Sequence, residues 1–151
     1  MNHIDFFKLQ AKRLKNDFNT KKRIYDETGN GYLLEFTPKY FDVENIEVTY
    51  DLSNKEIESF SLMKSQHFIA QLVGFRKWND LINSDPDELE LAKLLFENQH
   101  KLSIDDWEGY ITEAEISNDT SFCSEGRLEI FKMTFLVDAD FATSPNDFRL
   151  N

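Results

Sequence analysis

The side chains best suited to catalysis or metal binding are three histidines and one cysteine. Glu97 and His100 have the Glu-x-x-His spacing that places a carboxylate and an imidazole on one face of a helix, as in di-iron bundles. Such a site needs a second copy of the motif, but Lys64 stands where the partner of His67 would be. Since His100 also suits the negative end of a helix dipole, a metal-dependent enzyme is the least favoured interpretation.

Cys123 lies in a polar segment with no histidine near it in the sequence, which favours an unreactive thiol over a nucleophile. A single cysteine cannot form an internal disulfide. The chain has no Gly-rich phosphate loop, no cysteine or histidine pair at zinc spacing and no Gly-x-Ser-x-Gly elbow. We therefore expect no cofactor, no metal and no enzymatic activity.

Charge is distributed unevenly over the 151 residues, whose net charge is −11. Residues 1–23 carry +5, and the other 128 residues carry −16. The basic side chains at the start are either solvated charges on a helix that packs against its own acidic domain, or a face that binds an acidic partner or nucleic acid. The candidate partner-binding residues are Lys8, Lys12, Arg13 and Lys15, together with Arg76 and Lys77.

Hydrophobic periodicity predicts a helix over 4–18, because apolar residues recur every three or four positions there. That stripe consists of Ile4, Phe7, Ala11, Leu14 and Phe18. A two-stranded antiparallel ribbon is expected over 32–50, formed by 32–36 and by 45–50, where Ile46, Val48 and Tyr50 alternate with polar residues.

Residues 61–117 predict a helical core with explicit start and stop signals. Ser61 is placed to cap the first helix of this region, and Gly74 to end it. Pro86 at a first helical position, after Ser84 or Asp85 as the cap, opens a second helix. Ser103 and Asp106 form a Ser-x-x-Asp capping signature that opens a third.

The C-terminal element over 127–138 fits either a strand or a helix, because its apolar residues match both periods. We favour a helix, since Leu128, Glu129 and Lys132 are good helix formers. The remaining tail is expected to be a loop held by Phe141 and Phe148.

A helix, a glycine and a second helix over 66–81 are arranged as in a helix-turn-helix, with Ala70 four residues before Gly74. Lys64, Arg76 and Lys77 would supply its positive charge. The apolar position expected in the second helix is occupied by Asp80, and the acidic body would repel phosphate. A structural turn is therefore favoured over a nucleic-acid interface.

Residues 9–18 and 65–81 also carry a two-part pattern, consisting of Ala11, Lys12 and Leu14, then Ala70, Gly74, Phe75, Trp78, Asn79 and Leu81. This pattern resembles the small helical domain of bacterial glyoxalase-related proteins. The chain differs by about forty extra residues between the two parts and by further helices after Leu81. Since no glyoxalase fold repeat or metal-ligand set is present, lyase activity is not carried over, and the resemblance implies a helical domain of poorly defined role.

The sequence as a whole predicts a mainly α single-domain helical bundle (1–151) with a small β ribbon. No apolar run approaches the ~18 residues of a membrane span, and the start lacks a signal-peptide core, so we expect a cytoplasmic protein. The expected function is that of a non-enzymatic protein–protein interaction or regulatory module. The alternatives are a nucleic-acid-associated regulator using 66–81 and, last, the metal-dependent enzyme.

Overall fold

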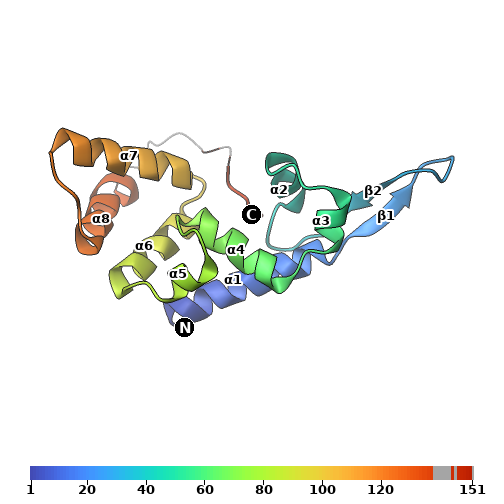
Figure 1. The fold of residues 1–151 in the computed structure, drawn as a ribbon, viewed down its shortest axis with the longest axis horizontal. Helices are drawn as coiled ribbons and strands as arrows, with labels where there is room; N and C mark the ends of the chain where they lie inside the picture. The colour runs from blue at the N-terminus through green and yellow to red at the C-terminus, as the bar shows by residue number, and fades with distance from the viewer. Residues whose placement is uncertain (138–143, 145, 151) are drawn as a thin grey trace. The chain divides into compact units, whose positions relative to one another are not determined.

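The computed structural model describes residues 1–137, 144 and 146–150, and over them the chain is mainly helical with one two-stranded antiparallel sheet (Figure 1). The fold class predicted from the sequence is thereby confirmed. The chain divides into two compact units. We call Met1–Phe7 with His67–Asp147 the helical unit, and Lys8–Gln66 with Phe148–Asn151 the hairpin unit. The expectation of a single domain stays a prediction.

The elements follow one another without long connections. The first are α1 (His3–Phe18), β1 (Lys22–Tyr25), β2 (Tyr32–Glu35), α2 (Val43–Thr49), α3 (Asn54–Glu58) and α4 (Leu62–Leu72). They are followed by α5 (Trp78–Ile82), α6 (Pro86–Glu97), α7 (Ile104–Ser117), α8 (Ser124–Phe131) and the π-helix η1 (Lys132–Leu136). The helical core predicted over 61–117 corresponds to α4–α7.

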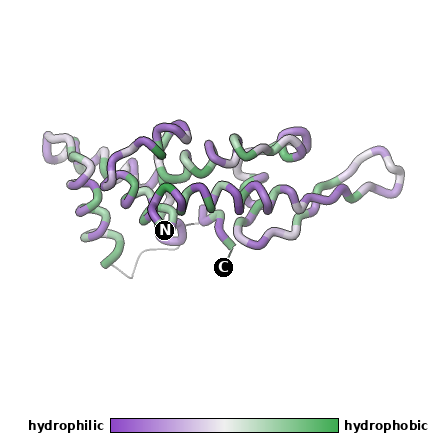
Figure 2. The backbone as a smooth tube through the Cα atoms, turned by 90° about the horizontal axis from the view of Figure 1, so that it is seen from below, coloured by the Kyte–Doolittle hydropathy of each residue, from purple (hydrophilic) through white to green (hydrophobic). Residues whose placement is uncertain are grey.

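Helix α1 confirms the prediction over 4–18 and begins one residue earlier. Its start is capped by Asn2, whose Oδ1 accepts the backbone N–H of Asp5 over 2.7 Å. Hydrophobic and hydrophilic residues alternate along its tube in Figure 2. Four residues of the predicted stripe, Phe7, Ala11, Leu14 and Phe18, have no exposed surface. The fifth, Ile4, is half-buried.

Asp17, in the last turn of α1, fastens the segment that leads into α2. It is 2% exposed, and its carboxylate accepts the backbone N–H groups of Lys39, Tyr40 and Phe41 over 2.9, 2.9 and 2.7 Å. Three charge-assisted hydrogen bonds offset the burial of the carboxylate. These hydrogen bonds hold the segment between β2 and α2 against the end of α1.

The ribbon predicted over 32–50 is wrong in its second strand. Residues 32–35 do form a strand, but it pairs with the unpredicted strand β1, with Ile24 opposite Leu33. The segment 45–50 belongs instead to helix α2, which Asp42 caps by accepting the N–H of Asn45 over 3.2 Å. Only one of its three alternating apolar residues is buried, namely Ile46. Tertiary packing and the cap therefore override the alternating pattern.

The predicted stop after α4 is confirmed at Gly74, whose φ is +92°. The N–H of Phe75 donates to the carbonyl of Ala70 over 2.9 Å, and the N–H of Gly74 to that of Gln71 over 3.2 Å. This pair of bonds is a Schellman motif, in which glycine takes the left-handed conformation at low steric cost.

The predicted starts of α6 and α7 are also confirmed. Asp85 caps α6 and forms a capping box with Glu88, with Pro86 in the first turn. Ser103 and Asp106 form a second capping box at α7. In each box the side chain of the N-cap residue accepts the backbone N–H of the residue three positions later, and the side chain of that residue accepts the N–H of the N-cap. Both N–H groups would otherwise lack a partner within the helix.

The helix preferred over 127–138 is confirmed for α8, which begins earlier, at Ser124, and continues as the π-helix η1. Lys101 donates from Nζ to the carbonyl of Phe135 over 3.1 Å and so provides a hydrogen-bond donor for a backbone carbonyl of η1. In the tail Phe148 is buried, and its ring lies 5.8 Å from that of Tyr50. The predicted anchor Phe141 lies outside the described residues.

Candidate functional site

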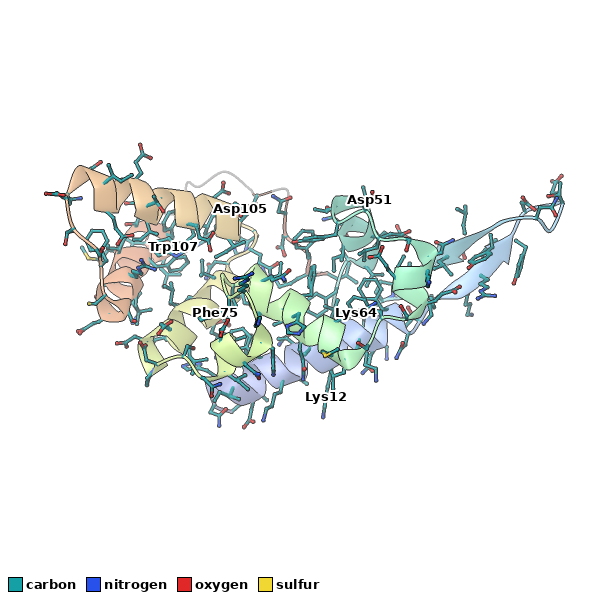
Figure 3. The ribbon with its side chains drawn as sticks, viewed as in Figure 1. Lys12, Asp51, Lys64, Phe75, Asp105 and Trp107 are labelled. Carbon is teal, nitrogen blue, oxygen red and sulfur yellow. The ribbon has the colours of Figure 1, made fainter. Side chains whose placement is uncertain are left out.

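The basic side chains of α1 lie along one helix but have different surroundings. Lys8 and Lys12 are exposed, and Figure 3 shows Lys12 pointing away from the ribbon. Lys15 is half-buried. The guanidinium of Arg13 lies 4.3 Å from the centre of the Tyr40 ring, a cation–π contact. Lys8 and Lys12 are therefore the more accessible of these four candidates.

Arg76 and Lys77 are exposed in the turn between α4 and α5 and belong to the helical unit, whereas the α1 cations belong to the hairpin unit. The second helix of the predicted helix-turn-helix is α5, which has five residues, fewer than two turns. Its Trp78 and Leu81 are buried. The nucleic-acid hypothesis stays a prediction, in which the short helix α5 would be the recognition helix.

The histidine and cysteine candidates are not brought together. Glu97 and His100 are both exposed, and the described part of the chain contains no group of three or more His, Cys, Asp or Glu placed to hold a metal ion. His67 accepts the backbone N–H of Trp78 at Nδ1 over 3.3 Å. Because Lys77 provides no side-chain cap for α5, His67 supplies the acceptor from α4.

A mainly apolar pocket of about 310 Å³ lies in the helical unit between α6, α7, the turn after α4 and the start of α8. Phe75 and Trp107, both labelled in Figure 3, belong to its wall. Its apolar lining comprises Val73, Gly74, Phe75, Leu91, Ala92, Leu95, Ile104, Trp107, Ile111 and Phe122. Its polar lining comprises Glu88, Glu108, Cys123, Ser124 and Arg127.

Gly74 allows α7 to approach the end of α4 on one side of the pocket. A Cβ at this position would lie 3.0 Å from Cδ1 of Ile104 and 3.3 Å from Oε1 of Glu108. Both distances are shorter than ordinary van der Waals contact. The absence of a side chain, required by the Schellman turn, therefore also places Ile104 and Glu108 against the pocket.

The opposite side of the pocket is held by Glu115 of α7. Its Oε1 accepts from Nη2 of Arg127 over 3.3 Å, and its Oε2 accepts the backbone N–H of Phe122 over 3.0 Å. Ser124 donates from Oγ to Oδ2 of Asp85 over 2.8 Å and ties the start of α8 to the start of α6. These bonds position Phe122, Cys123 and Arg127 beside the apolar lining.

The two carboxylates that line the pocket are poorly compensated. Burial, and then a hydrogen bond with Asp85, raise the pKa of Glu88 above its ordinary value. Burial, and then the charge of Asp105, raise the pKa of Glu108. In both cases the surroundings disfavour the ionised form, because water is partly excluded and neighbouring acids repel it.

The pocket can bind an apolar group and place it beside negative charge. Its cysteine is exposed and lies on the same side as Ser124, whose hydroxyl already donates to Asp85. Over the described residues, no histidine lines the pocket and no nucleophile–base pair of a catalytic triad is assembled there. The arrangement therefore suits binding better than covalent chemistry.

Comparisons of the chain with protein families, with curated proteins and with solved structures found no match. The resemblance to glyoxalase-related proteins stays a prediction. In the described part of the chain, no helix combines the length and the hydrophobicity needed to cross a membrane.

The patterns in the sequence did not identify this pocket. Trp107 and Ile111 are buried in α7, whereas Phe75 lies half-buried in the turn after α4. The sequence does not show that the helices leave a space beside these residues. Glu115 and Arg127 are 12 residues apart and separated by a turn, so no helical spacing connects them. The pairing of Phe122 with Glu115 depends on the path of that turn.

Proposed function

We propose that the chain is a non-enzymatic protein-binding module, and that the pocket of the helical unit receives an apolar side chain of a partner protein. The observation that carries this proposal is an apolar pocket with Trp107 and Phe75 in its wall. Aromatic side chains give large contact areas and are typical of the places where partners anchor.

The size of the pocket supports a side-chain anchor. At about 310 Å³ it lies at the lower end of the ~300–1,000 Å³ range of ligand pockets, which suits one bulky side chain better than a large cofactor. The pocket is also bordered by exposed polar residues such as Cys123 and Asp85. A polar border around an apolar centre is the usual anatomy of a protein interface.

Photo-cross-linking from Cys123 tests this function. As the single cysteine of the chain, exposed in the lining of the pocket, Cys123 can carry a maleimide–benzophenone without any substitution. We expect a defined cross-linked partner protein from lysate of the native host. The matched control places the same label on Met133, which is 73% exposed and outside the pocket lining, in a C123S/M133C variant.

A pocket-filling variant, Ala92→Leu, supplies the second comparison, because Ala92 lines the pocket and is 1% exposed. We expect it to abolish the cross-link while circular dichroism shows an intact helical fold. The same adduct from both label positions, or an adduct that Ala92→Leu leaves unchanged, would show that the pocket is not the binding surface.

A further inference from the structure

The negative charge of the chain is concentrated in the helical unit. Met1–Phe7 and His67–Asp147 contain 18 acidic and six basic residues, a net charge of −12. The hairpin unit contains 10 acidic and 11 basic residues, a net charge of +1. The division into units therefore assigns essentially all of the excess acid to the unit that holds the pocket.

Most of the basic side chains of the helical unit are already engaged inside it. Four of the six contact a carboxylate, a carbonyl or an aromatic ring of the same unit: Arg127 with Glu115 at 3.3 Å, Lys132 with Glu90 at 3.5 Å, Lys101 with the Phe135 carbonyl at 3.1 Å, and Lys93 over the Phe6 ring at 5.1 Å. The other two, Arg76 and Lys77, are exposed in the turn after Phe75 and do not line the pocket. The unit thus has little positive charge left for its own carboxylates.

The pocket concentrates this imbalance. Glu88 of α6 and Glu108 of α7 are in its lining. Asp85, the N-cap of α6, and Asp105, in the first turn of α7, each lie three residues before one of these glutamates. The one basic side chain of the lining, Arg127, donates from Nη2 to Glu115, which does not line the pocket. The charge of Arg127 also lowers the pKa of Glu88, but burial and the hydrogen bond with Asp85 outweigh it. The raised pKa of both glutamates is what carboxylates show when burial and neighbouring acids act on them without a sufficient counter-charge.

We infer that the partner segment received by the pocket is basic: a bulky apolar side chain flanked by lysine or arginine. This inference rests on the proposed function and specifies its partner. The apolar side chain fills the lining between α6 and α7, and the flanking cations lie over Glu88 and Glu108. Opposite charges around an apolar anchor accelerate association and reject acidic competitors.

Three synthetic peptides test the inference against the unlabelled wild-type chain. They are Lys-Lys-Gly-Phe-Gly-Lys-Lys, the same peptide with glutamate in place of lysine, and the lysine peptide with alanine in place of phenylalanine. Binding is measured by titration of backbone amide NMR signals and by the protection of Cys123 from iodoacetamide. We expect the lysine–phenylalanine peptide to bind about tenfold more tightly than either of the others, and its advantage over the glutamate peptide to shrink as salt is added.

Two charge-matched double variants locate the effect. Glu88→Gln/Glu108→Gln removes the two carboxylates of the pocket, while Glu97→Gln/Glu129→Gln removes two exposed carboxylates elsewhere in the helical unit. We expect the first pair to remove the preference for lysine over glutamate and to keep the preference for phenylalanine over alanine. The second pair should leave both preferences in place.

Several results would overturn the inference. The first is equal affinity for the lysine and glutamate peptides. The second is an equal loss of the preference for lysine over glutamate in both double variants. The third is protection of Cys123 by decanoate or by a second copy of the chain, but by none of the peptides. The proposed function would survive any of these if photo-cross-linking at Cys123 still captured a protein that Ala92→Leu excludes. Loss of that cross-link would instead remove the proposed function itself.

Discussion

Arg127 of α8 donates from Nη2 to Oε1 of Glu115 of α7 over 3.3 Å, across a turn that separates the two helices. The second oxygen of Glu115 accepts the backbone N–H of Phe122 in that turn over 3.0 Å. One carboxylate therefore fixes both the turn and the start of α8. Because Phe122, Cys123 and Arg127 all line the pocket, the shape of that wall depends on Glu115.

Replacement of Glu115 by alanine should loosen this wall. We expect iodoacetamide to alkylate Cys123 faster, and the free energy of unfolding to fall by about 1–2 kcal/mol, since a backbone donor and a partly buried guanidinium lose their acceptor. Glu115→Gln keeps one acceptor oxygen and should have an intermediate effect. Cys123 alkylation followed by mass spectrometry, with urea unfolding alongside, measures both. An unchanged alkylation rate in Glu115→Ala would show that the turn is held by other contacts.

Gly74→Ala should destabilise the chain by about 1–2 kcal/mol, because alanine at a φ of +92° is strained and its Cβ would meet Ile104 at 3.0 Å. The matched control is Gly109→Ala in the interior of α7, where a Cβ meets nothing within 4 Å. That change should stabilise by about 0.5–1 kcal/mol. Thermal unfolding of both variants provides the comparison. A Gly74→Ala variant as stable as the wild type would contradict the close approach of α7.

The additional variant Ile104→Val separates the two causes. It removes Cδ1, the atom at 3.0 Å, but leaves the backbone strain of Gly74→Ala in place. We therefore expect Gly74→Ala/Ile104→Val to lose less stability than the two single changes together. Strict additivity would indicate that strain of the turn accounts for the whole effect.

Local signals explain which parts of the fold the sequence predicts correctly. Gly74, Pro86 and the pair Ser103 and Asp106 act within a few residues of their helix ends, so their roles can be recognised without tertiary information. The alternation of Ile46 with Val48 is local too, but Val48 is 78% exposed, and the cap at Asp42 selects a helix. A strand pattern fails when only one of its apolar residues finds a buried environment.

The strand β1 and the pocket could not be predicted because their signals are long-range or weak. All four residues of β1 are exposed, so they show no alternation between buried and solvated positions. Its Arg23 is held instead by Glu58, 35 residues away, over 2.9 Å. The pocket likewise combines residues from four separate segments. Neither set of contacts follows from spacing along the chain.

Asp17 should be the most sensitive polar position of the hairpin unit. Asp17→Ala removes the acceptor of three backbone N–H groups, one of them buried, and we expect a loss of about 3 kcal/mol. Asp17→Asn keeps one acceptor oxygen and should lose less. Urea unfolding curves would measure both. Substitution of the exposed Asn16 by alanine is the control, with an expected change within about 0.5 kcal/mol.

The contribution of Glu108 to the free energy of unfolding should depend on pH, with a sign set by the direction of its pKa shift. Its pKa is raised in the folded state, so folding favours its protonated form; this contribution is present at low pH and is lost as the pH rises through the raised value. Above that pH the ionised carboxylate opposes folding, with Asp105 on α7 and Glu88 on α6 adding to the pocket's negative charge and Arg127 on α8 reducing it. Glu108→Gln should therefore stabilise at neutral pH by no more than about 0.5 kcal/mol, because Glu108 is an exposed residue whose charge is screened by solvent.

The advantage of Glu108→Gln over the wild type should shrink on acidification from neutral pH to about pH 4, because the carboxylate takes up its proton in the course of this change. Thermal unfolding between these two pH values measures the trend. The control is Glu113→Gln, an exposed position on the same helix and outside the pocket. An advantage of Glu108→Gln that grows on acidification would have the wrong sign and would contradict the assignment to burial.

The neighbouring cations Lys12 and Arg13 should respond differently to charge reversal. Arg13→Glu loses the cation–π contact with Tyr40, which lies 4.3 Å away, and should cost about 0.5–1 kcal/mol. Lys12→Glu changes an exposed side chain and should stay within about 0.5 kcal/mol of the wild type. Because Lys12 does not line the pocket, its charge reversal should also leave the photo-cross-link at Cys123 intact. Loss of that cross-link in a fully folded Lys12→Glu variant would assign partner binding to α1 as well.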